Sequence, residues 1–193
     1  MLPAIKERFK TNYLKHILLY LGIMVLIWIG VVIYAKMTMT PQQMVHTFAP
    51  TLGKGNVTHN FLPLFFWNES GALLTIALGL IPLPIYWFYI WTNAYSVGLV
   101  ISVMGNPFAT FALGILPHGI FEIPAQLIAA AISARLAWYG MNRFFRRKKQ
   151  DLQYGELIKQ TATDTLVIVT PLLFVAAIVE TYITPIFIHM LVH

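Results

Sequence analysis

The chain has 193 residues, of which 58% are apolar and only 10% are charged, and its mean hydropathy is +0.70. Because an average soluble domain carries about 25% charged residues, this composition excludes a water-soluble globule and indicates a protein dissolved mainly in lipid. The absence of cysteine excludes disulfide scaffolds, thiolate zinc sites and cysteine nucleophiles. The net charge is +6, and we interpret the positions of the basic residues as signals of membrane topology rather than as a surface that binds nucleic acid.

Five hydrophobic segments are expected to cross the bilayer, over residues 17–35, 68–91, 93–116, 117–139 and 165–188. The first is long enough to cross about 30 Å of hydrocarbon and lacks the cleavage site of a signal peptide. Pro82 and Pro84 are expected to kink the second segment. A break at Gly105-Asn106-Pro107 makes the third segment either one broken helix or a helix followed by a re-entrant piece. The sequence therefore predicts an all-α, polytopic transmembrane helical bundle in which residues 1–193 form a single domain.

The positions of Lys and Arg predict the orientation of the bundle. Four of them lie before residue 16 and six lie between Arg143 and Lys159, whereas the connection between the first two segments holds two. Cytoplasmic loops carry the excess of Lys and Arg, and two basic regions on one side require an even number of crossings between them. We therefore expect a multi-pass protein of the cell membrane with a cytoplasmic N-terminus, a basic cytoplasmic loop over residues 143–164 and an extracytoplasmic C-terminus; three spans are the alternative that parity allows.

Among the ionisable residues within the apolar segments, three need an explanation: His118, Glu122 and Glu180. Ionisable groups inside a span are costly, so each needs a partner or a function. His118 and Glu122 are four residues apart and share one face of a helix. The rise of the last segment places Glu180 at the same outer depth, and Asn68 and Glu69 begin an inward-running segment at that level. The predicted polar core consists of Asn68, Asn93, His118, Glu122 and Glu180.

Two interpretations of His118, Glu122 and Glu180 remain open. In the first, they form a hydrogen-bonded core that fixes helix packing, and no cofactor is needed. In the second, one imidazole and two carboxylates bind a divalent metal such as zinc with an open coordination position, and the metal activates a water molecule. The His-x-x-x-Glu spacing is not the His-Glu-x-x-His signature of zinc proteases, and no catalytic residue is assigned.

The run Leu116-Pro-His-Gly-Ile-Phe-Glu-Ile-Pro-Ala125 resembles the His-Gly-x-x-Glu-x-x-Ala stretch of the stage II sporulation protein M family of integral membrane proteins. Asn68 followed by Gly79 resembles a second element of that family, and Thr92-Asn93-Ala-Tyr-Ser-Val-Gly98 resembles a third, with Ala94 where the family commonly has Gly. Glu180 resembles the acidic residue of the family's last span. The resemblance implies a multi-span scaffold that holds partner proteins, in a family whose wider membership has no settled biochemical activity.

The sequence thus predicts a membrane scaffold or assembly protein without enzymatic activity of its own. A membrane metal-dependent hydrolase or transporter with a site at His118, Glu122 and Glu180 is the alternative. The expected partners are the lipid bilayer, other membrane or cell-envelope proteins and further copies of the chain, and nucleic acid is not among them. Stoichiometric metal in the purified protein separates the two interpretations.

Overall fold

A computed structural model describes residues 2–40, 42–44, 46, 60–103, 106–147 and 152–192. The described residues are almost entirely helical and contain no β-strand, so the predicted all-α fold is confirmed. The helices in chain order are α1 (Leu2–Arg8), the π-helical η1 (Phe9–Tyr13), α2 (Leu14–Thr38), α4 (Phe61–Leu78), α5 (Tyr86–Val103), α6 (Pro107–Ala109), the π-helical η2 (Thr110–Ile115), α7 (Leu116–Phe144), α8 (Tyr154–Asp164), the π-helical η3 (Thr165–Val169), α9 (Thr170–Ile178), the π-helical η4 (Val179–Ile183) and α10 (Thr184–Val192).

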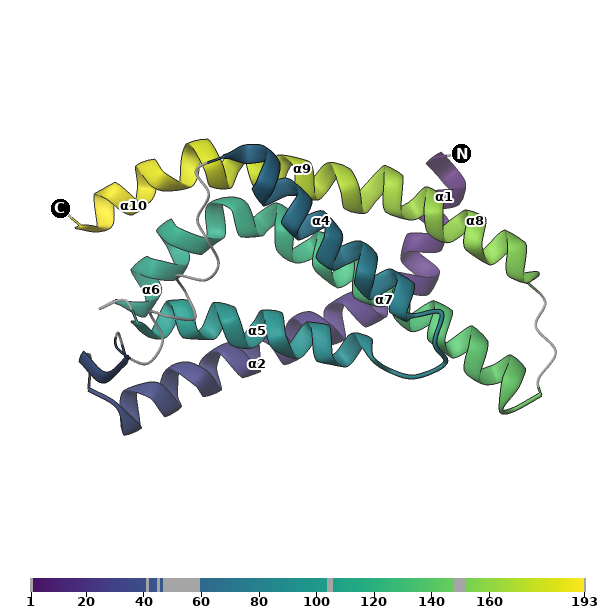
Figure 1. Ribbon diagram of the computed structural model, residues 1–193, viewed down its shortest axis with the longest axis horizontal. Coiled ribbons are helices and arrows are strands. Elements are labelled where there is room, and N and C mark those ends of the chain that lie inside the picture. The colour runs from purple at the N-terminus through teal and green to yellow at the C-terminus, as the bar shows by residue number, and fades with distance from the viewer. Residues whose placement is uncertain are drawn as a thin grey trace.

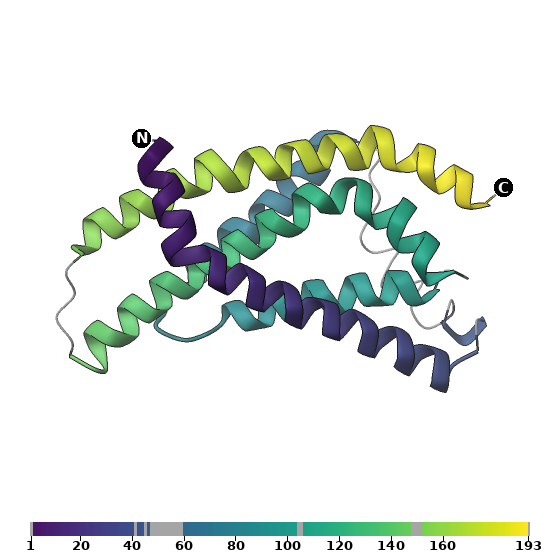
Figure 2. The ribbon, with the colours of Figure 1, turned by 180° about the vertical axis from the view of Figure 1, so that it is seen from behind.

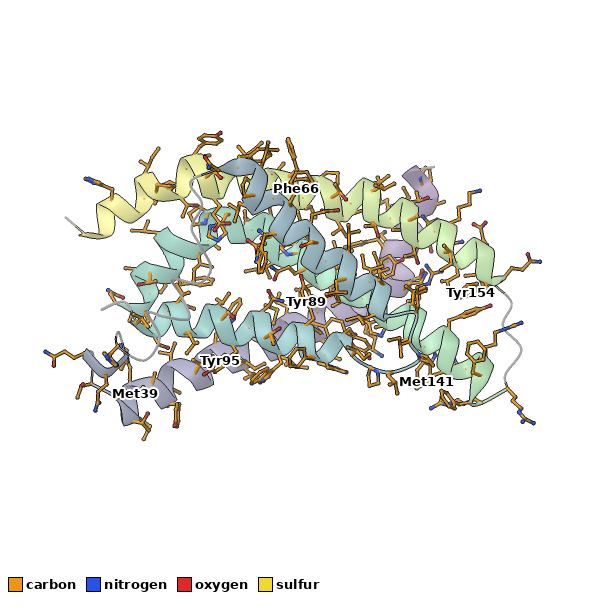
Figure 3. All side chains as sticks on the ribbon, viewed as in Figure 1. Met39, Phe66, Tyr89, Tyr95, Met141 and Tyr154 are labelled. Carbon is orange, nitrogen blue, oxygen red and sulfur yellow. The ribbon has the colours of Figure 1, made fainter. Side chains whose placement is uncertain are left out.

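In the described ranges these helices join into long helical runs that lie antiparallel along the length of the molecule, and we call each run a leg (Figure 1). Four stretches are long and apolar enough to cross a membrane: Pro3–Thr38, Phe61–Leu78, Pro107–Phe144 and Tyr154–Phe187. The N-terminal helix, the end of α7 and the start of α8 lie at one end, which we call the basic end, and the C-terminus lies at the other (Figures 1 and 2). Labelled side chains follow this layout, with Met39 at the far end and Tyr154 at the basic end (Figure 3).

Large apolar side chains cover the outside of the bundle, as lipid requires. Leu26 of α2 is 69% exposed and Trp67 of α4 is 76% exposed. Inside the bundle, α7 is the central helix, and its small residues Ala129, Ala130 and Ser133 are fully buried. This arrangement, with apolar groups outside and small groups at helix contacts, is typical of a membrane bundle.

The helix ends differ from the predicted boundaries of the second and third segments, residues 68–91 and 93–116. α4 ends at Leu78 and α5 begins at Tyr86, so Pro82 and Pro84 lie in a turn between two antiparallel helices rather than at a kink within one. Their missing N–H groups and fixed backbone geometry suit a connection better than a helix interior.

The leg that contains α7 begins earlier than expected, at Pro107. The side chain of Asn106 accepts hydrogen bonds from the backbone N–H groups of Phe108 and Ala109 at 3.1 and 3.2 Å, and so caps the helix. From there α6, η2 and α7 form one helical run, bent where η2 meets α7 (Figure 1). Residues 107–116 therefore belong to the same leg as residues 117–139. Residues 148–151 of the predicted basic loop lie outside the described residues.

Prolines accompany three of the π-helical turns. Pro117 lies two residues after the end of η2, Pro171 two residues after η3, and Pro185 two residues after η4. In each case the residue before the proline donates its backbone N–H to the carbonyl five residues earlier. Because proline has no N–H and its ring crowds the preceding turn, the helix widens there instead of breaking. The long legs therefore bend at positions fixed by the sequence.

A buried ion pair ties the N-terminal helix to the last leg at the basic end. Asp164 is fully buried, and Arg8 donates to it with Nε at 3.1 Å and with Nη2 to the second oxygen. The hydroxyl of Tyr13 donates to the same carboxylate at 2.8 Å. Arg135 of α7 donates to the Tyr13 hydroxyl at 3.2 Å and to Gln160 at 2.7 Å, so three legs meet in this network.

Replacing Gly79 tests the close approach of α4 to α7. A Cβ atom at Gly79 would lie 2.6 Å from the backbone oxygen of Ser133, which a buried helix cannot easily move, whereas a Cβ at Gly22 would meet nothing within 4 Å. We expect Gly79→Ala to destabilise the protein by about 1–3 kcal/mol and Gly22→Ala to be neutral or slightly stabilising. Thermal unfolding in detergent measures the difference, and equal melting temperatures for the two variants would contradict this contact.

Replacing Asp164 tests the buried ion pair. Asp164→Asn leaves the Arg8 guanidinium without its counter-charge, and breaking a buried pair in this way costs about 3–5 kcal/mol. The matched control is Glu7→Gln, which removes an exposed carboxylate beside Arg8. We expect a clearly lower melting temperature for Asp164→Asn alone. A variant that melts with the wild type would show that the pair does not hold the helices together.

Candidate functional site

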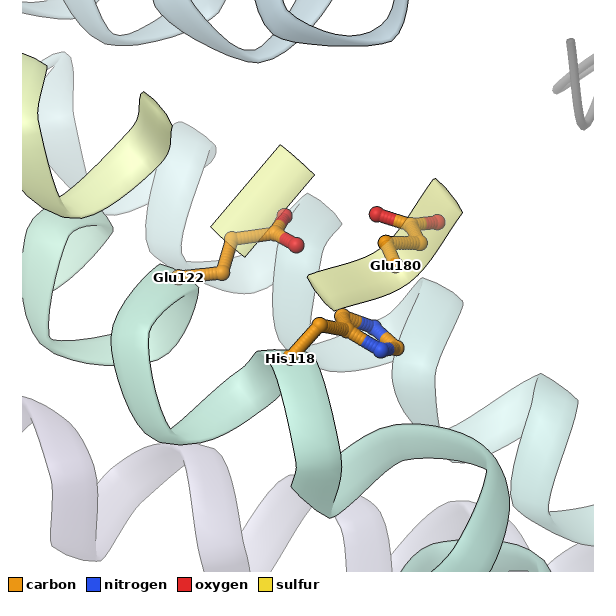
Figure 4. Close-up of side chains that lie close together, drawn as sticks. All are labelled: His118, Glu122 and Glu180. Atoms are coloured by element: carbon orange, nitrogen blue, oxygen red, sulfur yellow. The ribbon is translucent and has the colours of Figure 1, made fainter. Parts of the chain in front are cut away.

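Three of the predicted polar-core residues meet in the half of the bundle away from the basic end. His118 and Glu122 lie on the first turns of α7, and Glu180 lies on η4 of the last leg. One ligand atom from each residue lies within 4.8 Å of the other two, and all three side chains are half-buried. Figure 4 shows the two carboxylate groups and the imidazole turned toward a common space. Among the described residues no other group of three His, Asp or Glu side chains converges in this way.

A threonine orients the imidazole of His118. The Nδ1 atom lies 3.2 Å from the Oγ1 of Thr184, and that hydroxyl donates its own hydrogen to the backbone carbonyl of Val179 at 3.2 Å. Because the hydroxyl has only one hydrogen, it accepts from His118, so Nδ1 carries the proton. This assignment leaves the lone pair of Nε2 free to accept a hydrogen bond or to bind a metal.

Glu122 has a polar neighbour on its own helix. The Nε2 group of Gln126 donates to its Oε1 at 2.6 Å, across one turn of α7. In the described part of the chain, no Lys or Arg forms an ion pair with Glu122 or Glu180; the ion pair found there is that of Arg8 and Asp164. Two carboxylates this close in a low-dielectric interior cannot both stay charged unless a proton or a cation compensates them.

The donor set fits a divalent cation in its chemistry. One imidazole nitrogen and two carboxylate oxygens suit zinc, whose bonds to nitrogen and oxygen are about 2.0–2.2 Å long. Ligand atoms around such an ion lie about 3.4 Å apart, so the cluster, which spans up to 4.8 Å, would contract by about 1 Å on binding. Three protein ligands also leave one position open for water or substrate.

The two predicted asparagines make no hydrogen bond to the cluster in the described chain. Asn93 donates to the backbone carbonyl of Tyr89 on its own helix at 2.9 Å, and Asn68 is half-buried on α4. The amide of Asn93 therefore uses one of its donors within its own helix rather than on the cluster.

The sequence places Glu69 at the depth of the cluster without including it in the polar core, and the structure buries it between α4 and α9. Its side chain is only 9% exposed, and its Oε1 accepts a hydrogen bond from the hydroxyl of Thr170 at 2.7 Å. The other oxygen is buried without a partner among the described residues. The available signal is the helical spacing of Glu69, Ala72 and Ile76, which places the acid on the buried face of α4.

These features define a polytopic α-helical membrane protein with ionisable side chains gathered inside the bundle. The chain belongs to the stage II sporulation protein M family, which it matches over residues 17–185. The resemblance seen in the His-Gly-x-x-Glu run is thereby confirmed.

Two curated relatives come from the archaeon Methanocaldococcus jannaschii, and both are described as uncharacterized proteins. The chain is 31% identical to one of them over 134 residues, which cover 67% of this chain and 74% of that relative. It is 32% identical to the other over 148 residues, which cover 74% of this chain and 64% of that relative. No solved structure matches the chain significantly.

Proposed function

We propose that the protein is a multi-span membrane scaffold or assembly protein in which His118, Glu122 and Glu180 form a polar core. The observation that carries this proposal is their convergence from two distant parts of the chain within 4.8 Å. Polar contacts between membrane helices contribute less than about 2 kcal/mol each, so their main effect is to fix which helix faces meet. The bond between His118 and Thr184 fixes which face of α7 meets α10.

The helical architecture and the family membership support the scaffold proposal. Helices account for nearly all described residues, and four stretches of them are long and apolar enough to cross a membrane. Membership of the stage II sporulation protein M family is consistent with a protein that works by holding others in the membrane. Its partners would then be membrane or cell-envelope proteins, including further copies of the chain.

A membrane metal-dependent hydrolase or transporter is the second candidate, and one observation favours it. The bond to Thr184 leaves Nε2 of His118 without a hydrogen-bond partner on that side, and the imidazole lies next to two carboxylates that lack a basic partner in the described chain. Metal-binding histidines are oriented by such a bond on the opposite nitrogen. In this case the open position of the metal would bind water or the transported ion.

Metal content and unfolding separate the two candidates. For a scaffold we expect detergent-purified protein to hold no stoichiometric divalent metal and to melt at the same temperature with and without chelator. Glu122→Gln should then keep the fold, because an amide can replace a carboxylate in a packing contact, while His118→Ala lowers the melting temperature by the loss of its bond to Thr184. Near-stoichiometric zinc that is lost in His118→Ala and Glu122→Gln would overturn the scaffold proposal. Asn93→Ala, which removes a bond within one helix, is the matched control.

We also propose that the basic end faces the cytoplasm. The exposed residues Lys10, Lys15, Arg143 and Arg146 gather there, as expected for the side that retains positive charge.

The orientation can be tested cleanly because the chain has no cysteine. Gln42→Cys introduces a thiol at an exposed position beyond α2, and Gly155→Cys introduces one on α8 where a Cβ meets nothing within 4 Å. In intact cells, a membrane-impermeant maleimide should label Gln42→Cys and should label Gly155→Cys only after lysis. The reverse pattern would invert the proposed orientation.

A further inference from the structure

We infer that the basic end contains a binding pocket for the headgroup of an anionic glycerophospholipid. The ligand chemistry is a phosphate group with an attached apolar chain, and the pocket lies between η1, α2, α5 and α7. It is separate from the cluster at His118, Glu122 and Glu180 and does not depend on the proposed scaffold function.

The pocket is a cavity of about 490 Å³, and its lining includes Asn12, His16, Arg135 and Trp138. A smaller cavity of about 80 Å³ adjoins it and shares His16 and Trp138 in its wall. Leu19, which is 53% exposed, and Trp138, which is 52% exposed, both line the larger cavity. The cavity therefore opens sideways toward lipid, where a lipid chain can continue along the apolar surface of the bundle.

The electrostatic argument rests on Arg135. Its guanidinium donates to Tyr13 and Gln160, which uses two of its five N–H groups. No carboxylate forms an ion pair with it in the described chain, because Asp164 is already paired with Arg8. Two acids lie one residue further along its network: Asp164, which accepts from Tyr13 and is paired with Arg8, and the exposed Glu156, which accepts from Gln160 at 3.2 Å. The wall of the cavity thus holds a positive charge with donors available for an anion.

A second arginine packs against the wall residue Trp138. The guanidinium carbon of Arg146 lies 4.6 Å from the ring centroid of Trp138, which itself lines the cavity. Two guanidinium groups, one in the cavity wall and one against Trp138, favour an anion with several oxygens such as phosphate and disfavour the cationic amine of a zwitterionic headgroup.

The aromatic lining fits the depth of a lipid headgroup. Tyr20, Tyr86 and Trp87 contribute to the wall, and the rings of Tyr20 and Trp87 pack edge to face with centroids 5.1 Å apart. Tyr and Trp gather where the headgroup region meets hydrocarbon. Met141, which lines the smaller cavity, lies at the basic end (Figure 3). A headgroup in this pocket would therefore sit at the same level as the basic residues of that end.

Native mass spectrometry of the detergent-purified full chain tests the proposal. The protein is titrated with a phosphoglycerol lipid, with a phosphocholine lipid of the same acyl chains, and with inorganic phosphate. We expect one phosphoglycerol lipid to bind at least about fivefold more tightly than the phosphocholine lipid, because this is the gain in affinity for an anionic headgroup that one arginine near a membrane surface contributes. Arg135→Gln should lose this preference, Arg135→Lys should keep most of it, and Arg143→Gln, which removes an exposed charge outside both cavities, should keep all of it.

Arg146→Gln and Trp138→Ala keep the test decisive if Arg135→Gln fails to fold, because neither residue belongs to the network around Asp164. Each should reduce the preference by about threefold or more. The proposal is overturned by equal binding of the two lipids, by equal losses in Arg143→Gln and Arg146→Gln, or by binding of inorganic phosphate without the lipid. The bound mass separates the last case from lipid binding directly.

Discussion

Hydrocarbon offers no water to a free N–H or C=O group, so the chain must satisfy its backbone within its own helices, and this constraint shapes the rest of the structure. The described residues are accordingly almost all helical. The same constraint explains how the prolines are accommodated. At Pro117, Pro171 and Pro185 the helix does not break but widens into a π turn, in which the residue before the proline donates its N–H to the carbonyl five residues earlier.

One of these π turns also builds the polar cluster. The wide turn η4 carries Glu180, and its closing bond runs from Thr184 to the carbonyl of Val179. The hydroxyl of Thr184 donates to that same carbonyl and lies 3.2 Å from Nδ1 of His118. Pro185 itself is not a member of the cluster, but the π turn before it positions Thr184, and Thr184 orients the imidazole of His118. Backbone accommodation and site geometry have one local cause here, and π turns often coincide with functional positions for this reason.

The sequence was sufficient for the features that depend on helical periodicity. His118 and Glu122 follow from their spacing of four, and the depth of Glu180 follows from the rise of a helix. The turn between α4 and α5 was not predictable in the same way, because Pro82 and Pro84 are compatible with either a kink or a turn. The choice depends on Gly79 meeting the backbone of Ser133, which belongs to a helix far along the chain. The helical spacing of Glu69 indicates its buried face, but its partner Thr170 lies far along the chain and follows from no local pattern.

The two polar groups of the bundle differ in how their charge is balanced. At the basic end, Asp164 has Arg8 as its counter-charge, and the surplus charge of Arg135 lies at a cavity wall. At the other cluster, two carboxylates meet an imidazole with no arginine or lysine paired to them in the described chain. A buried pair of this kind is stable only if it takes up a proton or a cation, since two like charges in a low dielectric repel strongly. The positive charge of Arg135 at the basic end can therefore bind an anion, and the negative charge of the two carboxylates beside His118 can bind a proton or a metal ion.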